Sequence, residues 1–224
     1  MQQKYLLFDL DGTLTDPAVG ITNSVIYALK KFGIFVEDRR ELYPYIGPPL
    51  TDSFMRYHGL SAAQAEEALG YYREYFSVKG MFENVPYNGI AAFLEGLCNK
   101  GYTLMIATSK PEEFTVQILQ HFSLDKYFTF VAGNTLDESR PTKASVIAHL
   151  REQYPAVSAK NTLMIGDRKY DIVGARENGL PAIGVLYGYG SREELRGAGA
   201  TALAGDLTEL TAQIDFLLPI EKIP

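Results

Sequence analysis

Short apolar runs that alternate with helical patterns are the feature that most constrains how this chain folds. The apolar runs are residues 5–8, 102–108, 128–133, 161–167 and 181–188. Helical patterns separate most of these runs, at residues 89–100, 111–122 and 142–154. Near-continuous apolar strands joined by helices form a parallel sheet with helices on both faces. We therefore predict a doubly wound α/β fold, whose binding sites lie beyond the carboxyl ends of the strands.

Residues 17–84 break this alternation, because they contain helical patterns with no apolar strand between them. A chain of 224 residues is long enough for one large domain or for a core that carries an insertion. The simplest interpretation is an all-helical domain at 17–84, inserted into an α/β core domain formed by residues 1–16 and 85–224.

The composition limits the partners and the compartment. A net charge of −6 and a pI near 5.2 argue against a nucleic-acid-binding protein, which normally has a basic face. No apolar run approaches the roughly 20 residues of a membrane-spanning helix, and no secretory leader precedes the first strand. The single cysteine, Cys98, excludes an internal disulfide and fits a reducing compartment. We expect a cytoplasmic protein that binds neither nucleic acid nor membrane.

The stretch YLLFDLDGTLTD places two carboxylates, Asp9 and Asp11, where the first strand ends. Alternate side chains of an extended strand point the same way, so both acids can face one spot. Gly12 allows the backbone to approach a ligand closely or to adopt a positive φ. Taken alone, this motif fits an ordinary polar strand end followed by a turn. It is a poor match to a calcium-binding EF-hand loop, because Leu14 stands where that loop needs glycine.

Other strands end in residues of related chemistry. Asp167 follows a strand, and Asp171 stands four residues later, about one turn further if a helix begins there. Another strand ends in hydroxyl groups, and cations follow a further strand near a helix start. These residues are Thr108, Ser109, Arg140 and Lys143. Coincidence is a poor explanation for acids, hydroxyls and cations at four strand ends.

This combination of side chains suits phosphoryl transfer. Several carboxylates in one cleft repel one another unless a divalent cation neutralises them, and ligation by oxygen alone favours Mg²⁺. Hydroxyl groups, backbone N–H groups and a lysine suit the oxygens of a phosphoryl group. An aspartate can attack phosphorus as a nucleophile. We therefore expect Mg²⁺ as the cofactor and a small phosphorylated molecule as the substrate.

Four stretches of this sequence resemble the four motifs of the haloacid dehalogenase superfamily. They are DLDGTLTD, ATS, the lysine near RPTK, and GDRKYD, which together span residues 9–171. The helical insertion resembles the α-helical cap of the phosphoglycolate phosphatase-like group of that superfamily. The resemblance implies a Rossmann-like core and a Mg²⁺-dependent phosphomonoesterase.

The resemblance also implies roles for individual residues. Asp9 would be the nucleophile that forms an aspartyl-phosphate, and Asp11 would protonate the leaving oxygen and then help to activate water. Thr108, with Ser109 nearby, would hold the transferring phosphoryl group, and Lys143 would offset negative charge. The implied metal ligands are Asp9, the main-chain carbonyl of Asp11, Asp167 and, through water or as a supporting partner, Asp171.

The cation of the third motif has two candidates. In the commoner pattern a lysine directly precedes the proline, whereas Arg140 precedes Pro141 in this chain. We favour Lys143, because a compact ammonium at a helix start serves as a point charge. Arg140 remains the alternative.

Several functions compete within and beyond this resemblance. Phosphoglycolate or another small phosphorylated metabolite ranks first as the substrate, and a nucleoside 5′-monophosphate, hydrolysed by a 5′-nucleotidase, ranks second. A sugar phosphomutase would be expected to present a histidine early in the cap, where this chain reads DPAVGITN. A non-enzymatic phospho-acceptor module would be shorter and would lack the helical insertion.

A helix start is predicted near the C-terminal end of the chain. Ser191 is followed three residues later by Glu194. In a capping box, the serine side chain accepts from the backbone N–H at the third helical position, and the glutamate side chain reaches back to the N–H of the cap residue. We therefore expect Ser191 and Glu194 to open the helix REELRGAG in this way.

Overall fold

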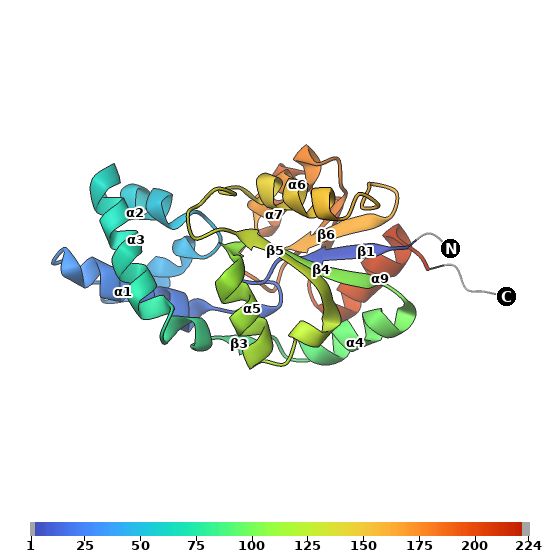
Figure 1. The fold of residues 1–224 in the computed structure, drawn as a ribbon, viewed down its shortest axis with the longest axis horizontal. Coiled ribbons are helices and arrows are strands. Elements are labelled where there is room, and N and C mark those ends of the chain that lie inside the picture. The colour runs from blue at the N-terminus through green and yellow to red at the C-terminus, as the bar shows by residue number, and fades with distance from the viewer. Residues whose placement is uncertain (1–2, 221–224) are drawn as a thin grey trace. The chain divides into compact units, whose positions relative to one another are not determined.

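The computed structural model describes residues 3–220 and has an α/β architecture, which confirms the predicted fold class (Figure 1). The strands are β1 (Tyr5–Phe8), β2 (Thr15–Asp16), β3 (Val85–Pro86), β4 (Thr103–Pro111), β5 (Phe128–Asn134), β6 (Thr162–Gly166), β7 (Ala182–Val185) and β8 (Ala202–Ala204). The α-helices are α1 (Ala18–Lys31), α2 (Leu50–His58), α3 (Ala62–Phe76), α4 (Ile90–Lys100), α5 (Glu112–His121), α6 (Lys143–Gln153), α7 (Lys169–Glu177), α8 (Arg192–Ala198) and α9 (Leu207–Leu217). Among residues 3–220, none of the helices has the length and apolar character needed to span a bilayer.

The main sheet has the strand order β5-β4-β1-β6-β7-β8, and each neighbouring pair is parallel. All five predicted apolar runs are strands of this sheet. β8, at the edge, is an additional strand that the apolar pattern did not reveal. β1 pairs with β4 on one side and β6 on the other, so that Phe8 lies opposite both Ile106 and Ile165.

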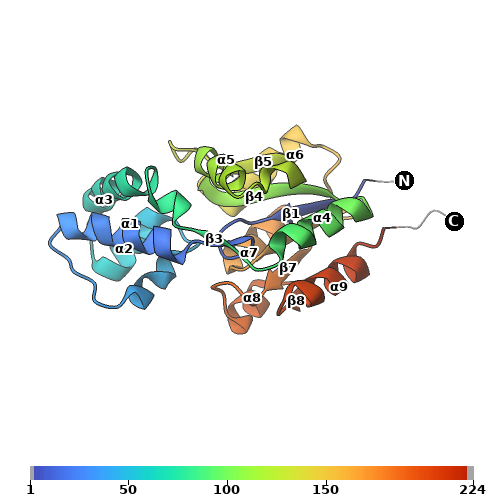
Figure 2. The same ribbon diagram turned by 90° about the horizontal axis from the view of Figure 1, so that it is seen from below.

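Alternation along β1 sends side chains to two helical layers. Tyr5 and Leu7 belong to a buried cluster that includes Val146 of α6 and Ile172 of α7. Phe8 faces the other way, and its ring lies 6.2 Å from the ring of Phe93 in α4. Figure 1 shows α6 and α7 above the strands, and Figure 2, which is seen from below, shows α4 and α9 on the other face of the sheet. By the same alternation, Asp9 should point toward the side of the sheet that carries α6 and α7.

The described chain divides into two compact units. One comprises the described residues up to Leu14 together with those from Pro86 onward, and the other spans Thr15–Val85. The first unit holds the six-stranded sheet. The second holds α1, α2, α3 and the 3₁₀ helices η1 (Arg39–Tyr45) and η2 (Gly80–Phe82). The two-residue strands β2 and β3 pair where the chain passes between these units.

The second unit has a buried core of its own. Leu29, Phe54 and Leu69 come from its three α-helices and are almost completely buried. The ring of Tyr45 packs edge-on against Phe54 at 5.2 Å. Because α1 packs against both η1 and α3, this segment has the contacts of a helical domain rather than those of a long loop.

Candidate active site

The parallel register brings the carboxyl ends of β1, β4 and β6 together. Asp9 directly follows Phe8, and its backbone N–H donates to the carbonyl oxygen of Ile165 at 2.9 Å. Thr108 and Asp167 each stand two residues beyond the partners of Phe8 on the flanking strands. The side chains that end the three strands therefore start from one edge of the sheet.

Three carboxylates form a buried cluster at this edge. One ligand atom from each of Asp9, Asp167 and Asp171 lies within 4.8 Å of the others. Asp9 is 7% exposed and the other two are at most 1% exposed. Asp9 comes from the end of β1, Asp167 from the end of β6, and Asp171 from the first turn of α7. Three buried carboxylates at this spacing repel one another unless cations neutralise them.

Lys143 supplies one of these cations. Its Nζ lies 2.7 Å from Asp9 Oδ1 and 2.7 Å from Asp171 Oδ1, and it also donates to the carbonyl oxygen of Ala107 at 2.9 Å. Lys143 is the first residue of α6, whose start is fixed by a capping box between Thr142 and Ser145. The side chain is only 3% exposed. A lysine so placed neutralises one charge and leaves the cluster net negative.

Only one of the two carboxylate oxygens of Asp167 has a hydrogen-bond partner among the described residues. Oδ2 accepts the backbone N–H of Tyr189 at 2.7 Å, whereas Oδ1 is buried without a hydrogen-bond partner among the described residues. Burial, together with the nearby charges of Asp171 and Asp9, raises the pKa of Asp167 well above its ordinary value. Burial also raises the pKa of Asp171 to about 6, although Lys143 opposes that rise. An unpaired carboxylate oxygen among converging acids is a donor set that fits a divalent cation.

Asp171 is held from two sides. Lys143 contacts its Oδ1, and the backbone N–H of Arg168 donates to its Oδ2 at 3.0 Å. These contacts suit a carboxylate that supports the site or binds a metal through water, which are the two roles that the family resemblance implies for Asp171.

Asp11 lies beside a cation that the sequence analysis missed. Lys110 Nζ is 2.7 Å from Asp11 Oδ2, and the Lys110 side chain is 6% exposed. Burial raises the pKa of Asp11, and Lys110 counteracts part of that effect. The stretch ATSK contains this lysine, but nothing in its local pattern reveals an ion pair with a residue 99 positions earlier. The Asp11 carboxyl therefore has a fixed partner outside the cluster of three acids.

The hydroxyl residues of β4 lie at the same edge. Thr108 is 1% exposed, and its Oγ1 accepts the backbone N–H of Lys110 at 3.3 Å. Ser109 is partly exposed. Lys110 thus contacts Asp11 through its side chain and the Thr108 hydroxyl through its backbone N–H.

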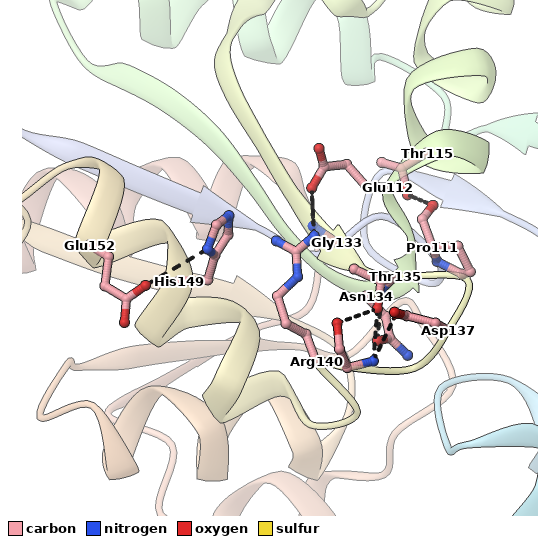
Figure 3. Close-up of polar contacts among 11 residues, drawn as sticks. Pro111, Glu112, Thr115, Gly133, Asn134, Thr135, Asp137, Arg140, His149 and Glu152 are labelled. Carbon is pink, nitrogen blue, oxygen red and sulfur yellow. Dashed lines mark hydrogen bonds and ion pairs between the residues drawn. The ribbon is translucent and has the colours of Figure 1, made fainter.

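Arg140, the alternative cation, has a different partner. Its Nη2 lies 3.3 Å from Glu112 Oε2, at the start of α5. Figure 3 shows the Arg140 side chain directed toward Glu112 and Gly133. Glu112 Oε2 also accepts the backbone N–H of Gly133 at 3.5 Å, so this pair links the ends of β4 and β5.

Gly12 makes room for the acid cluster. Its φ is +80°, a conformation that disfavours any residue with a side chain. A Cβ at this position would also overlap the carboxylate of Asp167. The positive φ that the sequence suggested for this glycine is present, and the close contact at this position is with the Asp167 carboxylate.

Comparison with known proteins gives a family match and several similar proteins. The family described as haloacid dehalogenase-like hydrolase has a sequence model that matches residues 6–185. The chain is 46% identical over 205 residues to a 5′-nucleotidase of Pseudomonas aeruginosa, covering 92% of each protein. It is 28% identical to a phosphoglycolate phosphatase of Vibrio parahaemolyticus, with 92% of this chain and 94% of that protein covered. A crystal structure of a predicted phosphatase from Clostridium acetobutylicum superimposes with a TM-score of 0.91 at 49% identity, covering 96% of this chain and 99% of that one.

Proposed function

The chain belongs to the haloacid dehalogenase-like hydrolases and is a phosphatase, and from this premise we propose that it is a Mg²⁺-dependent phosphomonoesterase that works through an aspartyl-phosphate. The observation that carries this proposal is the buried cluster of Asp9, Asp167 and Asp171, bridged by Lys143 at the carboxyl edge of the sheet. A structural ion-pair network would not need an acid with an unpaired, buried oxygen.

Mg²⁺ is the cation that this donor set favours. Asp9 and Asp167 would hold it through carboxylate oxygens and Asp11 through its main-chain carbonyl, with Asp171 as a supporting partner. When bound, the ion would neutralise the acids and draw negative charge from the phosphoryl oxygens. Ligation by oxygen alone selects Mg²⁺ over metals that prefer nitrogen or sulfur.

The protein's own residues would divide the chemistry as follows. A carboxylate oxygen of Asp9 attacks phosphorus, the bond from phosphorus to the substrate oxygen breaks, and the proton of Asp11 passes to that leaving oxygen. Asp11, now ionised, takes a proton from water as the water oxygen attacks the aspartyl-phosphate, which releases phosphate and regenerates Asp9. Thr108 and Ser109 would hold the phosphoryl oxygens, and Lys143 would offset the charge of Asp9 and the phosphoryl group.

We assign the two parts of the chain separate tasks. Residues 1–16 and 85–224 would be the catalytic core, and residues 17–84 would be a cap that excludes bulk water and helps to select the substrate. The contact-based division at Leu14 and Pro86 lies within two residues of these boundaries and supports the assignment.

For the substrate, we place a nucleoside 5′-monophosphate ahead of phosphoglycolate. The relative that is named a 5′-nucleotidase shares 46% identity with this chain, whereas the one named a phosphoglycolate phosphatase shares 28%. The greater identity supports the nucleotide and reverses the order that the sequence analysis favoured.

A phosphate-release screen tests this function. Purified protein with Mg²⁺ is assayed on nucleoside 5′-monophosphates, phosphoglycolate and p-nitrophenyl phosphate, with Asp9→Asn as the blank. We expect multiple turnover by the wild type, none by the blank, and the highest kcat/KM on a nucleotide. Full activity in the blank would rule out Asp9 as the nucleophile, and stoichiometric labelling without turnover would favour a phospho-acceptor role.

A further inference from the structure

We propose that Glu194, on α8, is a positioning residue that sets the metal affinity of the acid cluster by fixing the backbone between Asp167 and Asp171. This inference rests on the proposed function, because it concerns the same site. Glu194 would act through its contacts with residues 168 and 169.

One carboxylate oxygen of Glu194 accepts two hydrogen bonds from this segment, one from the Arg168 side chain and one from the backbone N–H of Lys169. Glu194 Oε1 lies 2.9 Å from Arg168 Nε and 2.9 Å from the backbone N of Lys169. The two side chains are partly buried, at 14% exposure for Arg168 and 23% for Glu194. A partly buried, charge-assisted contact of this kind is stronger and better oriented than a surface ion pair.

The backbone held by Glu194 in turn holds an acid of the cluster. The N–H of Arg168 donates to Asp171 Oδ2 at 3.0 Å, and Arg168 is the residue that precedes the first turn of α7. Asp167 is its direct neighbour in the chain. A displacement of Arg168 would therefore move the acid that precedes it and remove a donor from the acid that follows.

The residues that precede Glu194 contact Asp167, at the other end of the segment between Asp167 and Asp171. The N–H of Tyr189 donates to Asp167 Oδ2 at 2.7 Å. A Cβ on Gly190 would overlap the carbonyl oxygen of Asp167, so the two backbones lie in direct contact. Residues 189–194 thus meet the loop at Asp167 by close packing and at Arg168 and Lys169 through one carboxylate.

The predicted capping box is only half formed, because the Glu194 side chain binds the segment at Arg168 and Lys169 instead. Ser191 Oγ accepts the N–H of Glu194 at 3.1 Å, as expected. The Glu194 carboxylate, however, does not complete the box, because it turns to Arg168 and Lys169 instead. Helix capping alone would not require a carboxylate at position 194.

A direct metal titration tests this role. Metal-free protein is titrated with Mn²⁺, which reports free ion by electron paramagnetic resonance, and kcat is measured separately at saturating metal. The variants are Glu194→Ala and Glu194→Gln, and the matched control is Glu193→Ala, which removes an exposed carboxylate from the same first helical turn. Circular dichroism verifies the fold of each variant.

We expect Glu194→Ala to weaken Mn²⁺ binding about 10-fold or more, the usual effect of losing a partner that orients metal ligands. The value of kcat at saturating metal should stay near that of the wild type, and Glu194→Gln, which keeps an acceptor oxygen, should recover part of the affinity. Equal Mn²⁺ affinity in Glu194→Ala and Glu193→Ala would overturn the proposal. If Glu194→Ala does not fold, the same comparison is made with Glu194→Gln. A wild type that binds no Mn²⁺ would instead refute the metal site itself.

Discussion

The ammonium group of Lys143 lies 2.7 Å from Asp9 Oδ1, although the two residues are 134 positions apart in the chain. The same ammonium lies 2.7 Å from Asp171. One buried lysine therefore joins the end of β1 to the first turns of α6 and α7. Because both acids lose their only described cationic partner without it, Lys143 is the residue on which the electrostatics of the site most depends.

Replacement of Lys143 should be far more damaging than replacement of Arg140. We expect Lys143→Ala to lower kcat/KM by about 10²-fold or more, the order of loss when a preorganised electrostatic group is removed. Arg140→Ala should have a much smaller effect, since Arg140 pairs with Glu112. The assay is p-nitrophenyl phosphate hydrolysis at saturating Mg²⁺, with Lys143→Met as a second variant of similar side-chain length. The reverse ranking of the two residues would make Arg140 the cation of the third motif.

Lys110 gives a prediction about the pH profile. Burial raises the pKa of Asp11 and Lys110 lowers it, so Lys110→Met should raise that pKa further. If Asp11 must be protonated to serve as the acid, activity is lost as pH rises through its pKa. The alkaline limb of kcat should therefore move to higher pH in Lys110→Met. Lys100→Met, at an exposed lysine paired with Asp215, is the control that should leave the profile unchanged. If the alkaline limb of the kcat profile does not move in Lys110→Met, Lys110 does not control the protonation of the catalytic acid.

The fold was largely predictable because buried parallel strands leave a strong signal. The runs at 5–8 and 128–133 match the observed β1 and β5 within one residue. β8 escaped prediction because its apolar run is only three residues long, Ala202–Ala204, and two of the three are only partly buried at the edge of the sheet. Edge strands are identified by their neighbours rather than by their own composition.

The candidate site was predictable only in part: the acids could be predicted from the sequence, and their partners could not. Acids that end strands can be read from the sequence, because the sheet carries all carboxyl ends to one edge. The residues that contact those acids cannot be read from the sequence in this way. Lys110 contacts Asp11, and Glu194 contacts Arg168 and Lys169; these contacts depend on how a side chain lies after packing. Local patterns instead suggested that Glu194 would complete a capping box.

Gly188 should be intolerant of a side chain. A Cβ there would overlap the carbonyl oxygen of Gly12 and the Cβ of Asp167. We expect Gly188→Ala to lower the free energy of unfolding by about 1–3 kcal/mol, as overpacking does, and to weaken metal binding. Gly96→Ala is the control, because a Cβ at this position of α4 meets open space. That substitution should raise the free energy of unfolding by about 0.5–1 kcal/mol. Denaturant titration of the two variants measures these changes in the free energy of unfolding. Equal effects of Gly188→Ala and Gly96→Ala would show that the backbone can move to make room for a side chain at position 188.

Stability should depend on pH and Mg²⁺ in a linked way. Without metal, the pKa of Asp171 is raised to about 6 and that of Asp167 is raised well above its ordinary value. Between the ordinary carboxyl pKa and these raised values, the native state binds more protons than the unfolded state. The free energy of unfolding of the metal-free protein should therefore fall as pH rises from 5 to 8.

Mg²⁺ should reverse that loss, because it binds the ionised carboxylates and competes with protons. We expect the increase in Tm caused by Mg²⁺, relative to EDTA, to be small at pH 5 and to grow toward pH 8. Thermal unfolding at four pH values with and without the ion measures it, and Asp167→Asn should abolish most of the increment at every pH. An increment that is independent of pH would mean that the ion binds elsewhere, since binding to buried acids with raised pKa values must compete with protons in this range.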